Sequence, residues 1–235
     1  MTLWRKKLET ILMNIYGNTE DSNQRLVKKT FMHENLTDFD SIKGFLDHEE
    51  GILLYKMAKK YCIKTFAVEV GSYCGKSACY IGEACKENNT HLVTIDHHRG
   101  SEEQQFGEEY FDPEEYDYEK ERVDTLPSLL KNISRFQLNE YIKVMVETSK
   151  SASKKIKNEI DFLFIDGSHT FESARADYES WKEKIRVGGI LTIHDIYDSE
   201  LEGGQAPKEI YEKALGENFI LIKRVKSLVA LEKIS

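Results

Sequence analysis

The stretch VEVGSYCGKSA, at Val68–Ala78, decides the expected fold of this chain. Its first residues are apolar and β-branched, as in a buried strand, whereas Lys76 and Ser77 have the character of a helix start. Between them, Gly71 and Gly75 bracket a tight turn, because glycine tolerates backbone conformations that a Cβ would hinder. The free N–H groups at the start of a helix favour an anionic group. The stretch therefore predicts a strand, a turn that approaches a ligand, and a helix.

Short apolar runs recur along the chain on either side of this stretch. The expected parallel strands are Thr65–Val70, His91–Ile95, Ile142–Val146, Phe162–Ile165 and Gly189–Ile193. Helices are expected at Ser77–Lys86, Ser173–Ile185 and Pro207–Leu215. This alternation predicts an α/β fold with a doubly wound, mostly parallel sheet that carries helices on both faces. Near the C-terminus, only two residues separate Phe219–Val225 from Leu228–Leu231, which predicts an antiparallel hairpin.

The chain divides into two expected parts. Residues 1–62 carry apolar side chains at helical spacing and predict a helical N-terminal cap, whose third helix begins near Asp47 and ends at Tyr61. Residues 63–235 form the α/β domain. Within it, residues 97–124 are polar and acidic, with interleaved aromatic side chains. Loops of this length in compact domains are usually functional lids or disordered, and the interleaved aromatic side chains favour a lid that packs on another part of the molecule.

The composition narrows the class of function. The 235 residues carry a formal net charge of −8, which argues against a nucleic-acid partner. No apolar run reaches the roughly 20 residues that span a bilayer, so we expect no membrane partner. The four cysteines include no CxxC pair and are typical of thiols in a cytoplasmic protein. We therefore expect a cytoplasmic protein that acts on a small molecule, and the apolar N-terminal helices could form a homodimer contact.

Polar residues follow three further expected strands. Asp96 ends the second strand, about 20 residues after the glycines, where a carboxylate can accept hydrogen bonds from ribose hydroxyls. FIDGSH, at Phe164–His169, ends the fourth strand. In VGGILTIHD, at Val187–Asp195, the paired glycines are expected to turn the chain into the fifth strand. Because ligands bind beyond the carboxyl ends of parallel strands, these strand ends should share one crevice with Gly71.

These motifs resemble the class I, Rossmann-like methyltransferases that depend on S-adenosylmethionine, in particular the branch related to caffeoyl-CoA and catechol O-methyltransferases. The resemblance covers Thr65–Ile234 and rests on the spacing E-x-G-x-x-x-G from Glu69, on IDGSH and on the GG-strand-HD segment. It implies that the glycine loop surrounds the methionine part of the cofactor, that Ser77 holds its carboxylate and that Asp96 holds its ribose. On this basis the expected cofactor-binding residues are Glu69, Gly71, Ser72, Tyr73, Gly75, Ser77, Asp96, His97, Ser151, Asp166 and His169.

Methyl transfer to a hydroxyl requires that a proton be removed, and two devices stay open. One is a divalent cation such as Mg²⁺ or Mn²⁺, for which Asp166, His194 and Asp195 offer oxygen and nitrogen ligands. The resembling enzymes carry Asp-Asn where this chain has His194 and Asp195. The other device is a histidine base. The expected catalytic residues are therefore His169, His194 and Asp166.

The sequence does not name the methyl acceptor. The expected substrate contacts are His98, Arg99 and Glu102, at the start of the lid: Arg99 could bind a carboxylate or phosphate, and Glu102 an amine. We favour an oxygen atom as acceptor over nitrogen. Two other functions stay open. One is an NAD(P)-dependent oxidoreductase, which requires the motif GxGxxG, whereas this chain has Tyr73 in place of the middle glycine. The other is a protein that binds S-adenosylmethionine without catalysis, which needs neither a metal nor a base.

Overall fold

The computed structural model describes residues 36–168 and 170–235. The chain forms two compact units, residues 1–41 and residues 42–235. In the first unit, the described part contains the 3-10 helix η1 (Asp38–Ser41), in which the Ser41 hydroxyl donates to the Asp38 carbonyl at 2.6 Å. The helices expected before residue 36 lie outside the described residues.

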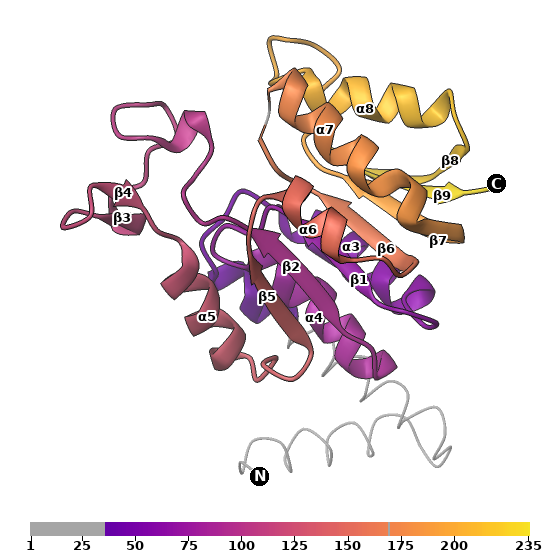
Figure 1. The fold of residues 1–235 in the computed structure, drawn as a ribbon, viewed down its shortest axis with the longest axis horizontal. Coiled ribbons are helices and arrows are strands. Elements are labelled where there is room, and N and C mark those ends of the chain that lie inside the picture. Colours follow the sequence, from indigo (N-terminus) through magenta and orange to yellow (C-terminus); the bar gives the residue numbers. More distant parts are fainter. Residues whose placement is uncertain (1–35, 169) are drawn as a thin grey trace, which may run out of the picture. The chain divides into compact units, whose positions relative to one another are not determined.

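The second unit contains a seven-stranded sheet with the strand order β5-β2-β1-β6-β7-β9-β8 (Figure 1). Its strands are β1 (Ala67–Val70), β2 (Leu92–Asp96), β5 (Ile142–Val146), β6 (Ile160–Ile165), β7 (Ile185–Ile193), β8 (Phe219–Val225) and β9 (Leu228–Lys233). The first five are parallel to one another, whereas β9 pairs antiparallel with both β7 and β8. The doubly wound, mostly parallel sheet and its C-terminal antiparallel hairpin are thereby confirmed.

Helices lie between the strands. They are α3 (His48–Tyr61), α4 (Lys76–Asn88), α5 (Leu126–Arg135), α6 (Ser149–Lys155), α7 (Phe171–Trp181) and α8 (Ala206–Leu215). Helix α3 packs on α4, while α7 packs on both α6 and α8. As expected, α3 begins near Asp47, which caps its N-terminus and whose side chain accepts the Glu49 N–H at 2.8 Å. Among the described helices, none is long and apolar enough to cross a bilayer.

Burial on both faces explains the continuous apolar runs of the central strands. On one face, alternate strand residues such as Val68, Ile95 and Leu163 join the fully buried Tyr178 and Trp181 of α7 in a single hydrophobic core. All four cysteines are free and buried, which agrees with their reading as unpaired thiols.

The start of β7 differs from the expected one. Gly188 and Gly189 do not turn the chain into this strand, because β7 already begins at Ile185 and contains both glycines. They lie at an irregularity of the pairing with β6, where Gly188 adopts a φ of +73°. The helix expected to end at Ile185 ends at Trp181; the 3-10 helix η4 (Lys182–Lys184) follows it, and Ile185 is already paired within the sheet.

The segment expected to be a lid, residues 97–124, connects β2 to α5 (Figure 1). It contains the 3-10 helices η2 (Glu102–Gln104) and η3 (Pro113–Glu115) and a small antiparallel sheet of β3 (Tyr116–Asp117) and β4 (Arg122–Val123). Its aromatic rings pack on one another, with centroids 4.9 to 5.8 Å apart; they belong to Phe106, Phe111, Tyr116 and Tyr118. The acidic segment therefore has a local apolar cluster of its own.

Candidate active site

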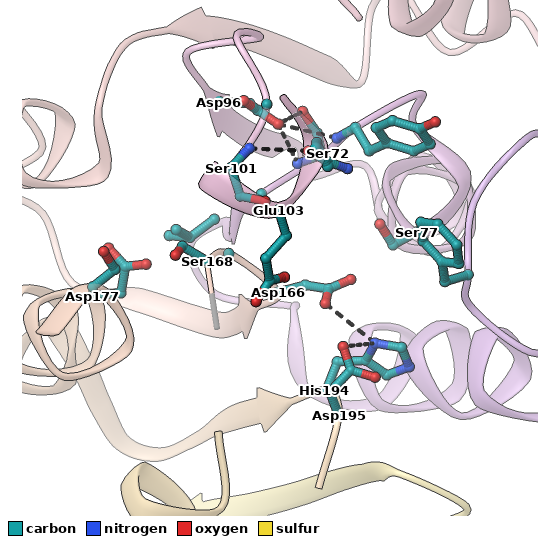
Figure 2. Close-up of a pocket in the computed structure, with 18 of the residues that line it drawn as sticks. Ser72, Ser77, Asp96, Ser101, Glu103, Asp166, Ser168, Asp177, His194 and Asp195 are labelled. Atoms are coloured by element: carbon teal, nitrogen blue, oxygen red, sulfur yellow. Dashed lines mark hydrogen bonds and ion pairs between the residues drawn. The ribbon is translucent and has the colours of Figure 1, made fainter. Parts of the chain in front are cut away.

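The carboxyl ends of the parallel strands open into one cavity of about 530 Å³. Among the residues that line this cavity are the following predicted site residues: Gly71, Ser72, Tyr73, Ser77, Asp96, His97, Asp166, His194 and Asp195. Figure 2 shows Asp96 and Ser72 at one wall of the cavity, Ser77 at another, and Asp166 between them and His194. The strand-end residues that the sequence singled out are thus brought together.

Two glycines shape the loop between β1 and α4. Gly71 has a φ of +86°, and a Cβ there would lie 2.0 Å from the Asp166 carbonyl oxygen, so no larger residue fits against the end of β6. Gly75 has a φ of +90° and precedes α4 directly; a Cβ there would lie 2.5 Å from Leu129 Cδ1. The close approach to the backbone at the end of β6 explains Gly71, and the positive φ explains Gly75.

Asp96 fastens this loop to the end of β2. Its Oδ2 accepts the N–H groups of Ser72 and Tyr73, at 3.0 and 3.1 Å. Its Oδ1 accepts the N–H of His98 at 2.7 Å. A carboxylate offers about four acceptor positions, so Asp96 retains capacity for hydroxyls in the cavity that it lines.

Glu69 lies beneath the cavity. Its side chain is fully buried, and Oε2 accepts the Thr94 hydroxyl at 2.5 Å. Burial raises the pKa of Glu69 to about 8, and the hydroxyls of Ser77 and Thr94 offset this only in part. Since Ser77 lines the cavity and Glu69 does not, Glu69 can act on a ligand through Ser77.

Asp166, His194 and Asp195 form a cluster at the ends of β6 and β7 (Figure 2). His194 Nδ1 lies 3.2 Å from Asp166 Oδ1 and 3.4 Å from Asp195 Oδ2. One ligand atom from each residue lies within 4.8 Å of the other two, so their oxygen and nitrogen donors fit one divalent cation. Asp195 also accepts the Tyr197 hydroxyl at 2.9 Å, which fixes its direction.

Glu50, on α3, is a site residue that the sequence reasoning missed. It is 2% exposed, and its Oε2 accepts His194 Nε2–H at 3.0 Å. Its Oε1 accepts the N–H and the hydroxyl of Ser227, at 2.9 and 2.8 Å. The D-x-x-E spacing from Asp47 predicts a capping glutamate, and Glu50 does accept the Asp47 N–H at 3.1 Å. Its contact with a strand end far along the chain has no local signal.

The surroundings of His194 determine its charge. Burial alone would lower the pKa of His194, but Asp166, Asp195 and Glu50 outweigh burial and hold this pKa well above its usual value. Without another cation in the cluster, the ring is therefore an imidazolium that donates from both nitrogens. In that state it cannot accept a proton from a substrate.

Several predicted residues lie away from the cavity lining. The buried His98 ring contacts the Thr125 hydroxyl through Nδ1, at 2.8 Å, and Arg99 pairs with Asp124 at 3.2 Å. The Ser151 hydroxyl donates to Glu147 at 2.8 Å. Of the remainder, Glu102 and Gly75 are also absent from the lining, and His169 lies outside the described residues. Residues close to them in the sequence line the cavity instead: Glu103, next to Glu102, and Ser149, two residues before Ser151.

Two aromatic rings of the cavity lining, those of Phe45 and Tyr110, were also missed. Phe45, which precedes α3 and is 70% exposed, stacks on Tyr73 with a centroid distance of 6.2 Å. Its edge meets Tyr110 of the lid segment at 5.8 Å. All three rings line the cavity. Since Phe45 and Tyr110 come from elements without a recognisable motif, only the folded chain shows that they meet.

Residues 68–196 match the family described as "Methyltransferase domain", and this match covers more than half of the chain. The chain belongs to this family. Membership confirms the class predicted from the glycine loop, an S-adenosylmethionine-dependent methyltransferase. It also decides against the oxidoreductase alternative. The matched residues of this methyltransferase contain the glycine loop, Asp96 and the Asp166–His194–Asp195 cluster.

Solved structures share the fold of this methyltransferase at low sequence identity. The O-methyltransferase TomG of Streptomyces achromogenes, in complex with S-adenosylmethionine, is 12% identical, with full coverage of both chains and a TM-score of 0.58. An O-methyltransferase from Bacillus cereus in complex with S-adenosylhomocysteine is 14% identical over 97% of each chain, with a TM-score of 0.57. A putative caffeoyl-CoA O-methyltransferase from Staphylococcus aureus is 10% identical over all of both chains, with a TM-score of 0.56. At these identities the likeness is one of fold.

Proposed function

We propose that this methyltransferase transfers the methyl group of S-adenosylmethionine to an oxygen atom of a small molecule, in the cavity at the carboxyl edge of the sheet. We further propose that Asp166, His194 and Asp195 hold a divalent cation there. The observation that carries the proposal is the convergence of Asp96, Ser77 and this cluster on one cavity.

The cavity fits the cofactor in size and charge. Its volume of about 530 Å³ lies within the range of small-molecule sites. Its acidic lining residues are Asp96, Glu103, Glu147, Asp166, Asp177, Asp195 and Glu202, against the lysines Lys43, Lys76 and Lys150. A lining in which acids outnumber lysines suits the positively charged sulfonium and ammonium groups of the cofactor. When bound, S-adenosylmethionine supplies a methyl group already activated by its attachment to positive sulfur.

Each end of the cofactor has a proposed partner. Asp96 accepts the ribose hydroxyls while its bonds to Ser72 and Tyr73 hold the glycine loop in place. Ser77, at the start of α4, donates to the cofactor carboxylate, and the N-terminal end of that helix favours the negative charge. Glu69 orients Ser77 from below.

The metal cluster faces the same cavity. When bound, a divalent cation lowers the pKa of an acceptor hydroxyl and stabilises the resulting oxyanion. Glu50 takes the Nε2–H of His194 and thereby leaves Nδ1 turned toward Asp166 and Asp195, the arrangement typical of a metal-binding histidine and its supporting carboxylate. The nitrogen donor favours Mn²⁺ over Mg²⁺.

The aromatic part of the cavity lining favours a small acceptor. The rings of Phe45, Tyr73 and Tyr110 line the cavity and offer apolar faces to a planar molecule. By packing around the acceptor they would also exclude water from the methyl group.

Two titrations of the full chain test this proposal. Calorimetry with S-adenosylhomocysteine should show one binding site, and electron paramagnetic resonance should show Mn²⁺ binding that Asp195→Asn weakens by at least about 10-fold. Asp198→Asn, at an exposed acid three residues further on, should leave Mn²⁺ binding unchanged. Absence of Mn²⁺ binding with cofactor present would contradict the metal, and absence of heat would contradict the cofactor site.

A further inference from the structure

One further carboxylate lines the cavity away from His194 and Asp195. Asp177 lies on α7, and in Figure 2 it lies on the opposite side of Asp166 from His194 and Asp195. None of the roles derived above uses it. Its neighbours in the cavity lining include Ser149, at the start of α6, and Gly167, in the turn after β6.

A hydrogen bond from Trp181 orients the Ser149 hydroxyl, which interacts with this carboxylate. The fully buried Trp181 donates its Nε1–H to the Ser149 hydroxyl oxygen at 2.9 Å. Ser149 therefore keeps its own hydroxyl proton for another acceptor, and this hydroxyl lowers the pKa of Asp177. Asp177 and Trp181 are four residues apart on α7, so they share one face of the helix.

The absence of a side chain at Gly167 leaves space for the Asp177 carboxylate. A Cβ at Gly167 would lie 2.9 Å from Asp177 Oδ2, so a larger residue would push the carboxylate away from the end of β6. Burial raises the pKa of Asp177 to about 6, and the bond from Ser149 offsets this only in part. At neutral pH the group is therefore mostly an anion whose described partner is a single hydroxyl.

Asp177 is better placed to take a ligand than Glu147. Glu147 also lines the cavity, but one of its oxygens pairs with Lys155 and the other accepts the Ser151 hydroxyl. Lys155 thus neutralises the charge of Glu147, whereas the described surroundings of Asp177 include the Ser149 hydroxyl and no ion-pair partner. Asp177 therefore keeps its charge, and most of its acceptor positions, for a ligand in the cavity.

We propose that Asp177 reads the adenine base of the cofactor by accepting a hydrogen bond from its 6-amino group. This inference rests on the proposed function, in which the ribose lies at Asp96 and the methionine part lies toward Ser77 and Asp166. The base then extends to the part of the cavity lined by Ser149 and Asp177. A half-buried carboxylate there selects a base that donates a hydrogen bond and disfavours one that lacks the amino group.

Calorimetry on a two-by-two set of proteins and ligands tests the assignment. The ligands are S-adenosylhomocysteine and its analogue with hydrogen in place of the 6-amino group; the proteins are the native chain and Asp177→Ala. The native chain should bind the analogue about 10- to 100-fold more weakly than S-adenosylhomocysteine. The variant should bind both ligands with equal affinity, close to that of the native chain for the analogue. Glu172→Ala, at an exposed acid of the same helix, should behave as the native chain does.

The outcomes separate this inference from the function on which it rests. Equal affinity of the native chain for both ligands, or an Asp177→Ala variant that weakens both by the same factor, would overturn the role of Asp177 while leaving the cofactor site intact. Should Asp177→Ala fail to fold, Asp177→Asn keeps the shape without the charge, and its preference for the amino group should fall below that of the native chain. An unchanged preference would overturn the assignment. A native chain that binds neither ligand would overturn the proposed function itself.

Discussion

Glu50 and His194, 144 residues apart in the chain, meet in a buried contact in which His194 Nε2 donates to Glu50 Oε2 at 3.0 Å. The contact joins α3 to the end of β7, at the edge of the cavity. Glu50 precedes the residues that match the family, so a helix outside the matched segment completes the candidate site. Glu50 also ties this helix to the turn between β8 and β9 through Ser227.

Removal of Glu50 should therefore destabilise the fold. We expect Glu50→Ala to lower the free energy of unfolding by about 3–5 kcal/mol, because it leaves a buried imidazolium and the Ser227 N–H without their acceptor. Urea unfolding at pH 7 measures the change. Glu49→Ala, at an exposed acid on the same helix, should cost less than about 1 kcal/mol. Equal stability of the two variants would contradict the structural role of Glu50.

Asp112 joins the lid segment to the glycine loop. Its Oδ2 accepts the Tyr73 hydroxyl at 2.7 Å and pairs with Lys43 at 2.8 Å. Burial tends to raise the pKa of Asp112, but Lys43 and Tyr73 outweigh burial and lower it, so the carboxylate is charged at neutral pH.

We expect Asp112→Ala to loosen the lid without unfolding the protein. Hydrogen exchange in residues 97–124 should become roughly 5- to 10-fold faster, which corresponds to the loss of about 1 kcal/mol of local stability. Asp117→Ala removes an acid within the same segment that pairs locally with Lys120. If both variants accelerated exchange around Tyr73 alike, Asp112 would have no special role in holding the lid.

Asp161 predicts a pH dependence of stability. It is fully buried, and its Oδ2 accepts the N–H groups of Lys64 and Thr65 at 2.6 and 2.7 Å, while Arg186 pairs with Oδ1. Burial tends to raise the pKa of Asp161, but the Thr65 N–H and Arg186 outweigh burial, so the pKa in the folded state is lowered. The stabilisation is therefore present above the unfolded pKa of about 3.9 and lost as the pH falls through the folded pKa.

Asp161→Asn should remove this dependence. At pH 7 we expect the variant to be less stable than the native chain by about 2–4 kcal/mol, because Arg186 loses its buried partner. At pH 3 the difference should shrink, since this pH lies below the unfolded pKa of about 3.9 and the unfolded chain takes up a proton there that the native carboxylate binds less readily. Urea unfolding at both pH values tests this, with Glu159→Gln at an exposed acid as the control. A difference that grows on acidification would contradict the assigned direction of the pKa.

The fold could be predicted from the sequence because its signals are local. Each parallel strand contains an apolar run that a polar or glycine residue ends or follows. At the C-terminus, Lys226 and Ser227 are the only residues between β8 and β9, and two residues form a tight turn. The start of β7 could not be predicted, because Ile185 joins the sheet across an irregular pairing that depends on its partner Ile160.

Site residues could be predicted from the sequence only where they belong to a recognisable motif at the end of a strand. Asp96, Asp166 and His194 come directly from strand ends, and the sheet places such ends together. The directions of side chains in the lid could not be predicted: His98 turns into the interior toward Thr125, whereas Glu103 lines the cavity. Glu50 and Phe45 contribute through contacts between distant segments, and no spacing in the sequence encodes such contacts.

The central claim is that the cavity holds S-adenosylmethionine with its ribose at Asp96, and calorimetric titration with S-adenosylhomocysteine tests this claim most directly. The native chain should bind one molecule, and Asp96→Ala should weaken binding by about 1–3 kcal/mol through loss of hydrogen bonds to a charged group. Asp117→Ala should leave the affinity unchanged. Absence of binding to the native chain, or an Asp96→Ala variant with native affinity, would contradict the account.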